Sequence, residues 1–452
     1  ECTTLKRANG LMMQPKQIEG IKMKMSAFWW DIDERFTPSG QHALPKEVDF
    51  VVVGGGYTGL SAGLTIARQG KSVTVLDSGT PGFGASTRNG GICSGQIRLS
   101  HGMLSAQYGT EFADEAYSEG IEARLDLMKF CDDENIDCQF QMTGRFTGAM
   151  NLPDYDAQAR EVERLNRIDG HKAYMVARRD QHNEIDTDLF FGGMVREEIG
   201  GFHPAKFFAG LLKRTEEAGA IVLSDTAVHE VIDFPAGAKT VVTSKGKIKA
   251  NKVIMATNAY TGTKHKVGKF LRKRLVPAQS AIIVTEKLGT DKVRALIPKL
   301  RMCGNTANLY SYFRPTPDRD RILIGSRSFD RTKATQRTVT YLKRKLSHIF
   351  PELAECAVDY AWLGNVGFTR AQLPVIFEHN DIYYAAGYAG SGTVWARWLG
   401  KKVAETAMRT GNRTSVFYAP PPQSIPLYDG NPWFIPAIQY YFALKDWVKF
   451  RH

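Results

Sequence analysis

A short apolar strand that runs into a glycine triplet constrains this chain more than any other feature. Residues 50–53 form a continuous apolar run of the kind found in buried parallel strands. The triplet follows over 54–59 with the spacing G-x-G-x-x-G, and residues 60–69 have the pattern of an amphipathic helix. A second apolar strand over 72–76 ends at Asp77. This order and register predict a dinucleotide-binding βαβ unit.

Each residue type in this unit has a physical reason. Gly54 permits the sharp turn, Gly56 lets a pyrophosphate approach the backbone, and Gly59 lets the helix pack on the strand. The helix N-terminus offers unpaired N–H groups to phosphate, and the acid after the second strand can bind ribose hydroxyls. The residues expected to contact the cofactor here are Gly54, Gly56, Tyr57, Thr58, Gly59, Asp77 and Ser78.

A loop of small residues follows this unit. Residues 82–91 read GFGASTRNGG, a composition that can lie flat against a large planar ligand. Its polar side chains can donate to phosphate or ring oxygens, although the composition alone also suits a flexible surface loop. The expected cofactor contacts in this loop are Gly84, Ala85, Ser86, Arg88, Asn89, Gly90 and Gly91.

A second strand-to-helix turn lies near the C-terminus. An apolar strand over 382–386 enters the turn GYAGSG at 387–392, and a helix follows over about 393–409. Such a helix N-terminus can hold negative charge that develops on a reduced flavin, although alone it could equally be a structural turn. The expected cofactor contacts are Gly387, Gly390, Gly392 and Thr393.

These three glycine-rich segments, in this order, resemble the D-amino-acid-oxidase type of FAD-dependent oxidoreductase. The resemblance is greatest to members of the glycine/sarcosine-oxidase and γ-glutamylputrescine-oxidase-like kinds, and it extends over about residues 28–407. Further matching stretches are KVIMATNAY at 252–260, YSYFRPTPDRDRILIGSR at 310–327 and WLGNVGFTRAQLP at 362–374. The resemblance implies FAD as the cofactor, with additional contacts from Val228, Ala256, Thr257 and Gly364.

Two positions depart from the family pattern. Relatives often carry histidine in the late glycine turn, where this chain has Ser391. Some relatives bind FAD through a cysteine in the segment that matches 362–374, which has no cysteine in this chain. We therefore expect non-covalent FAD.

The resemblance implies an α/β fold with an α+β second domain. The Rossmann-like FAD-binding domain is expected to be assembled from three separated segments: 46–130, 200–263 and 360–412. A β-rich substrate domain is expected over two segments: 131–199 and 264–359. Residues 1–45 form an N-terminal arm, with Phe28–Trp30 as anchors. Residues 413–452 form a C-terminal tail, interpreted as a strap on the body rather than a membrane-surface helix.

The expected reaction is oxidation of a small amine or secondary amino acid. Hydride passes to flavin N5, the resulting imine hydrolyses, and O2 is reduced to H2O2. γ-Glutamyl amines and N-methyl or cyclic amino acids are candidate substrates. The alternative is a dehydrogenase of an amino or 2-hydroxy acid that passes electrons to a protein or quinone. The residues expected near the substrate are Tyr312, Arg314, Arg370, Tyr388 and Ser391.

The charge distribution bears on the partner. The chain has a net charge of +12, and residues 264–345 alone hold 21 Lys/Arg against 5 Asp/Glu. We interpret part of this basic block as a bias toward an anionic small molecule, because no RNA-binding module accompanies it. No metal-ligand spacing and no apolar run long enough to span a bilayer are present, and we expect a cytoplasmic protein.

Overall fold

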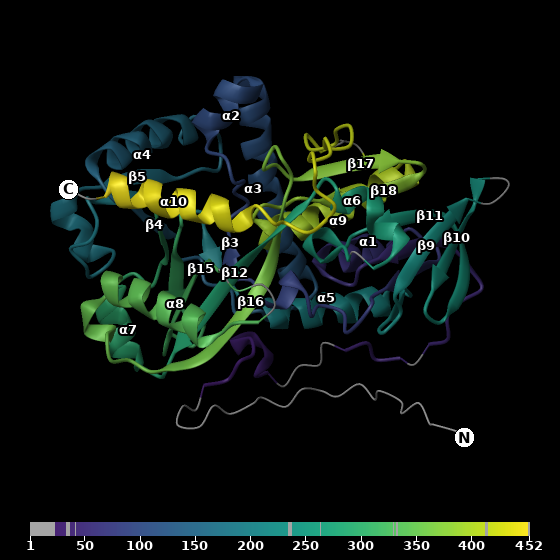
Figure 1. Cartoon of the computed structure of the whole chain (residues 1–452), viewed down its shortest axis with the longest axis horizontal. Coiled ribbons are helices and arrows are strands. Elements are labelled where there is room, and N and C mark those ends of the chain that lie inside the picture. The colour runs from purple at the N-terminus through teal and green to yellow at the C-terminus, as the bar shows by residue number, and fades with distance from the viewer. Residues whose placement is uncertain are drawn as a thin grey trace.

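Two large sheets divide the molecule. The computed structural model describes residues 23–32, 37–40, 42–233, 237–262, 264–328, 330, 333–411 and 415–450. Within these residues each sheet has eight strands, and they occupy the right and left halves of Figure 1. The arrangement confirms the predicted α/β fold with separated segments.

The first sheet is built on the βαβ unit. Its central strands run in the order β17-β18-β11-β1-β2-β8, and β10 and β9 extend it from β11. β1 is parallel to both β2 and β11, as a dinucleotide-binding unit requires. The strands are β1 (Glu47–Val53), β2 (Val73–Leu76), β8 (Ile221–Leu223), β9 (Val228–Asp233), β10 (Lys239–Thr243), β11 (Gly246–Met255), β17 (Val375–His379) and β18 (Ile382–Ala386).

Helices from three distant parts of the chain cover this sheet. α1 (Tyr57–Arg68) is almost wholly buried because it packs against α5 (Pro204–Glu217) on one side and α9 (Gly392–Met408) on another. α3 (Thr110–Asp133) packs on α9. The remaining elements of this part are α2 (His101–Tyr108), α6 (Lys269–Arg272) and a small sheet of β3 (Ile92–Cys93) with β7 (Gly200–Gly201).

The second sheet has the order β16-β12-β15-β14-β13-β4-β6-β5. Its strands are β4 (Arg145–Gly148), β5 (Ala173–Val176), β6 (Gly193–Arg196), β12 (Val276–Thr285), β13 (Met302–Asn305), β14 (Tyr312–Pro315), β15 (Ile322–Arg327) and β16 (Val358–Phe368). The helices around it are α4 (Leu152–Leu165), α7 (Thr290–Leu296) and α8 (Gln336–Ile349). β14 and β15 form an antiparallel hairpin within 310–327.

The long strand β16 forms the seam between the two halves. It pairs with β12 along its length, from Val358 beside Thr285 to Phe368 beside Val276. The domain boundary expected at residue 360 therefore passes through a strand of the second sheet. β16 stays paired with β12 beyond residue 360, as far as Phe368.

The described part of the N-terminal arm packs on the loop at 82–91. Trp29 is fully buried and its indole N–H donates to Asn89 O over 2.8 Å. The indole N–H of Trp30 donates to Thr87 Oγ1 over 2.8 Å, and the guanidinium of Arg88 lies over its ring. Phe28–Trp30 thus contacts the loop that was expected to hold the flavin.

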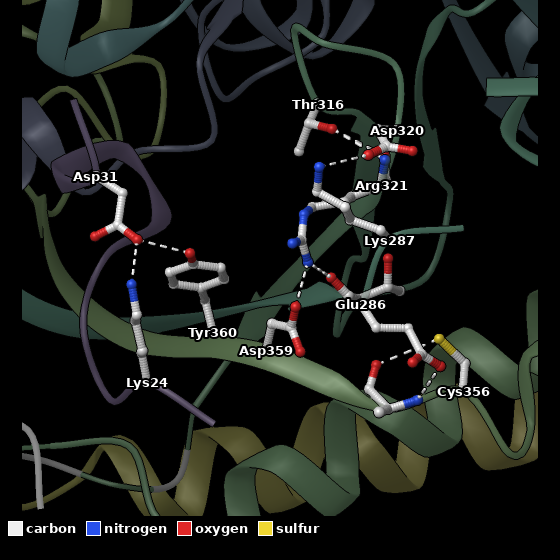
Figure 2. A network of polar contacts seen from close by, with 12 residues as sticks. Lys24, Asp31, Glu286, Lys287, Thr316, Asp320, Arg321, Cys356, Asp359 and Tyr360 are labelled. Carbon is white, nitrogen blue, oxygen red and sulfur yellow. Dashed lines mark hydrogen bonds and ion pairs between the residues drawn. The ribbon is translucent and has the colours of Figure 1, made fainter. Parts of the chain in front are cut away.

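A polar network fixes the arm to β16 (Figure 2). Lys24 N donates to Asp359 O over 2.7 Å, and its ammonium pairs with Asp31 over 2.5 Å. Tyr360 donates its hydroxyl to the same Asp31 carboxylate over 2.7 Å. Arg321 pairs with Asp359 over 2.5 Å. The arm is therefore bonded to both halves of the molecule.

The C-terminal helix α10 (Ile435–Lys449) crosses the half that holds the second sheet (Figure 1). Its Asp446 accepts from the backbone N–H groups of Asn308 and Leu309 over 2.8 Å each, and Lys449 pairs with Asp154 over 2.5 Å. These bonds make the tail a strap along the body. Among the described residues, no helix has both the length and the apolar character needed to cross a membrane.

We expect the substitution Trp29→Ala to lower the free energy of unfolding by about 3 kcal/mol, because it removes a buried ring and leaves a cavity. The matched control is Trp433→Ala, at a tryptophan that is 62% exposed. Urea unfolding followed by far-UV circular dichroism measures both. Equal midpoints for the two variants would show that the arm is not part of the folded core.

Candidate active site

A cavity of about 610 Å³ lies where β1, β2 and β11 end. Gly54 has a φ of +107°, and a Cβ there would stand 2.9 Å from Ala256 O. A Cβ on Gly59 would stand 1.8 Å from Gly54 O. Only glycine fits these positions, so the turn and the first turn of α1 can approach each other closely at the mouth of the cavity.

The acid at the end of β2 braces this turn. Asp77 Oδ2 accepts from Gly55 N over 2.8 Å, and Oδ1 accepts from Gly79 N over 3.0 Å. Burial raises the pKa of Asp77 above its usual value, and the two backbone bonds only partly offset this effect. Its side chain lines the cavity, where unused lone pairs on both oxygens can meet ribose hydroxyls.

The loop at 82–91 closes one side of the cavity. Ser86 Oγ accepts from Tyr57 N over 2.9 Å, so it contacts the N-terminus of α1. Asn89 holds the loop in its fold: its Nδ2 donates to Ser86 O over 2.7 Å, and its Oδ1 accepts from Gly91 N over 2.8 Å. On another side, the hydroxyls of Thr58 and Tyr388 share a hydrogen bond of 2.7 Å.

These features together fit a dinucleotide: a glycine cradle, helix N-termini, and a carboxylate at the end of β2. The expected residues that line this first cavity are Gly54, Gly56, Tyr57, Thr58, Asp77, Ser78, Gly84, Ala85, Ser86, Asn89, Val228, Ala256, Thr257, Tyr388, Gly390, Gly392 and Thr393. Gly59, Gly91 and Gly387 stand outside its lining and shape the backbone around it.

A second cavity of about 360 Å³ adjoins the first and reaches into the second sheet. The residues that line both cavities are Ala85, Asn89, Asn365, Val366, Gly390 and Thr393. Arg88, Gly90 and Gly364, expected as cofactor contacts, line this second cavity. The loop at 82–91, the glycine turn at 387–392 and the strand β16 therefore meet where the two cavities join.

The residues expected near the substrate are divided by the structure. Tyr312 and Ser391 line the second cavity, and Tyr388 lines the first. Arg314 is fully buried outside both linings, where its guanidinium donates to the carbonyl oxygen of Gly91 over 2.6 Å. It also donates to the carbonyl oxygens of Phe202 and Pro315. Burial lowers its pKa to about 9.

Arg370 lies away from both cavities. It is exposed, and it donates to the side chain of Gln423 over 3.3 Å. Neither predicted arginine therefore lies in the lining of the second cavity.

Other arginines, which the sequence did not single out, line that cavity. Arg327 ends β15, and β-strand alternation puts it on the same face as Gly325, which pairs with Tyr312. The hairpin pattern could have identified this arginine. Arg98 and Arg145 also line the cavity, but they lie in segments with no recognisable motif.

One further arginine at this cavity, Arg196, is neutralised by a carboxylate of the protein. Arg196 lines the cavity and pairs with Glu198 over 2.6 Å, and His171 lies 2.9 Å from the same carboxylate. Burial alone would raise the pKa of Glu198, but the His171 hydrogen bond and the Arg196 charge lower it to about 2.

Among the described residues, no group of three His, Cys, Asp or Glu side chains could hold a metal ion.

Comparison with known families decides the identity of the cofactor. The profile of the DAO family, described as FAD dependent oxidoreductase, matches residues 49–406. The chain belongs to the DAO family of FAD-dependent oxidoreductases. Gamma-glutamylputrescine oxidoreductase from Escherichia coli (strain K12) is 31% identical to it over 374 residues, which cover 82% of this chain and 85% of that protein. Membership confirms the predicted FAD cofactor and an enzyme that acts on CH–NH or CH–NH2 groups.

Solved structures share this DAO-family fold. Glycine oxidase from Geobacillus kaustophilus superimposes with a TM-score of 0.69 at 20% identity, over 82% of this chain and 97% of that one. L-Proline dehydrogenase from P. horikoshii superimposes with a TM-score of 0.67 at 20% identity, over 82% and 96%. The two-sheet arrangement around the cavities is thus that of known members of the fold.

The low pKa of Glu198 generates a prediction about acid stability. Because its folded-state pKa lies below its ordinary value of 4.5, the ionised form stabilises the fold fully above about pH 4.5. This contribution, about 3 kcal/mol, is lost as the pH falls toward 2. We expect Glu198→Gln to destabilise the protein at pH 6 and to flatten the decline in urea midpoint between pH 5 and pH 3. A decline as steep as that of the exposed-site control Glu355→Gln would contradict the pairing.

Proposed function

We propose that this enzyme is an oxidase of a small amine or secondary amino acid that bears a carboxylate, with non-covalent FAD and O2 as the electron acceptor. The observation that carries the proposal is a cation-lined cavity, with Arg327 and Arg98 in its wall, that opens onto the FAD cavity. The absence of cysteine from residues 362–374 supports non-covalent attachment.

FAD, when bound, would accept a hydride from the C–H beside the substrate nitrogen and pass the two electrons to O2, which gives H2O2. The substrate becomes an imine, and water hydrolyses it to a carbonyl compound and ammonia or an amine. The work left to the protein is to bind, orient and deprotonate the substrate.

Arg327 suits the carboxylate because its planar fork can donate two parallel hydrogen bonds. Tyr312 stands beside it, with its ring held between Gly90 and Gly325, where an added Cβ would meet the ring at 2.7 Å and 2.3 Å. Burial raises the pKa of Tyr312 to about 12. Its hydroxyl therefore stays protonated at neutral pH and can donate to the substrate.

The same cations assist deprotonation of the substrate. An ammonium group resists loss of hydride from its neighbouring carbon, so the amine must be neutral when it reacts. Positive charge on the arginines that line this cavity, Arg98 and Arg327 among them, disfavours a further positive charge there and lowers the pKa of a bound ammonium. In this way the cavity favours the reactive neutral amine without a dedicated base.

The names of relatives support the substrate class. One relative is named for γ-glutamylputrescine, an amine with a carboxylate at its far end, and another is named glycine oxidase. γ-Glutamyl amines and N-methyl or cyclic amino acids are therefore the proposed candidates. The alternative is a dehydrogenase that delivers electrons to a protein or quinone, since one solved structure of this fold is an L-proline dehydrogenase.

Two measurements test this function. Turnover of these amines with air as the sole oxidant should yield one H2O2 per substrate, whereas substrate-reduced flavin that persists in air would favour the dehydrogenase.

Arg327→Gln should lower kcat/KM for a carboxylate-bearing amine by about 100-fold or more, because it removes a charge-assisted bidentate partner. Arg294→Gln, at an exposed arginine of α7, is the control. An unchanged kcat/KM in Arg327→Gln would remove this residue from the substrate site.

A further inference from the structure

Five arginines are among the described residues that line the second cavity, and two of them, Arg98 and Arg327, form no hydrogen bond or ion pair with another described residue. Arg88 donates to Leu363 O over 3.1 Å. Arg196 pairs with Glu198 over 2.6 Å. Arg145 donates to neutral groups, Gln96 Oε1 over 3.1 Å and the hydroxyl of Tyr310. Among the described residues, neither Arg98 nor Arg327 has a carboxylate within ion-pair distance, although both line the cavity. The Arg327 guanidinium lies over the ring of Phe368, 4.8 Å from its centroid, a contact that leaves its charge and its N–H donors unneutralised. Both arginines can therefore bind an anionic ligand.

The acidic side chain in the cavity wall is already engaged. Glu161 is the carboxylate that the described lining contains. Its Oε1 accepts from His101 N over 2.6 Å, and its Oε2 accepts from Gly102 N over 3.2 Å and lies 3.5 Å from Arg164. It completes the start of α2 and does not neutralise the two free arginines.

Arg98 and Arg327 line the same cavity, so the charge of each acts on the other. The pKa of Arg327 is lowered to about 10, chiefly by burial and in smaller part by the positive charge of Arg98. Desolvation likewise lowers the pKa of Arg98, although its side chain keeps contact with solvent. Two like charges in the wall of one cavity are unfavourable unless a ligand supplies negative charge.

A single carboxylate offsets only one of these charges. Arg327 belongs to a strand of the second sheet, whereas Arg98 lies on the segment between β3 and α2, so the two guanidinium groups are held by separate parts of the fold. This inference rests on the amine-oxidase function above and narrows its substrate class to amines that bear a second acid group. We propose that the substrate is a small amine that carries two negative charges, one engaged by Arg327 and the other by Arg98. The second charge is borne by a second carboxylate or by a phosphonate group.

For a secondary amine with two carboxylates the reaction balances simply. Iminodiacetate, O2 and H2O give glyoxylate, glycine and H2O2: one C–N bond is broken by hydrolysis of the imine, and two electrons pass from the C–H carbon to O2 by way of FAD. Each product keeps one carboxylate, so cleavage divides the charge that held the substrate. Product release is therefore favoured relative to substrate binding.

The test compares two amines of similar size on the FAD-loaded enzyme. Iminodiacetate and N-ethylglycine share the secondary amine and one carboxylate, but the second carboxylate of the former is a methyl group in the latter. We expect anaerobic flavin reduction to be at least 30-fold more efficient, as rate over Kd, with iminodiacetate. Aminomethylphosphonate tests whether one dianionic group serves both arginines.

Substitution of Arg98 assigns the effect to this residue. Arg98→Gln should abolish most of the preference for iminodiacetate over N-ethylglycine, Arg98→Lys should restore part of that preference, and Arg294→Gln should leave it unchanged. A readout without turnover uses the unreactive thioethers thiodiacetate and (ethylthio)acetate, whose binding perturbs the flavin absorbance. The parent enzyme should bind thiodiacetate at least 30-fold more tightly than (ethylthio)acetate, and Arg98→Gln should lose this difference.

The outcomes separate the two proposals. If N-ethylglycine reduces the flavin as efficiently as iminodiacetate and both thioethers bind equally, the two-charge inference is overturned while amine oxidation stands. If no amine reduces the flavin, the proposed function fails, and the two thioethers still decide the charge requirement. Loss of preference in Arg294→Gln as well would attribute it to the general charge of the basic block and overturn the assignment to Arg98.

Discussion

The fold depends on two close backbone contacts at the first turn of α1, each of which only a glycine permits. Gly59 packs against Gly54 O, where a Cβ would stand at 1.8 Å, and Gly400 of α9 packs against Thr58 O, where a Cβ would stand at 2.3 Å. The first contact seats α1 over the end of β1, and the second seats α9 against α1. Both helices begin at the same cavity, so the N–H groups of their first turns would face the FAD phosphates and ring once the cofactor is bound.

The second sheet is joined to this cofactor unit by polar bonds to backbone atoms. Arg314 reaches from β14 to the carbonyl oxygen of Gly91, and Trp362 donates from β16 to Arg88 O over 2.9 Å. Trp29 completes the set through Asn89 O. The loop at 82–91 is thus held from three sides, and the second cavity forms on the side of the loop that faces the hairpin. This explains why a buried arginine without a carboxylate partner is retained in the hairpin.

The cofactor half of the site was predictable from sequence because its residues are consecutive. The turn at 54–59 and the turn at 387–392 each carry their own glycines, and most expected residues line the first cavity. The substrate half depends on pairing between strands. Arg314 and Arg327 both lie on the hairpin, but only the register of β14 against β15 places Arg327 in the cavity. Arg98 enters from a segment whose sequence has no periodic pattern, and only the fold brings it there. The basic block likewise divides, since Arg301 and Arg321 form ion pairs while Arg327 faces the substrate cavity.

The central claim is that a carboxylate-bearing amine lies between the flavin and Arg327. A crystal structure of the FAD-loaded enzyme with (methylthio)acetate, an unreactive analogue with sulfur in place of nitrogen, tests it most directly. We predict FAD along the first cavity and the inhibitor carboxylate within hydrogen-bond distance of the Arg327 guanidinium. An inhibitor carboxylate bound outside the second cavity, with Arg327 uncontacted, would contradict the account.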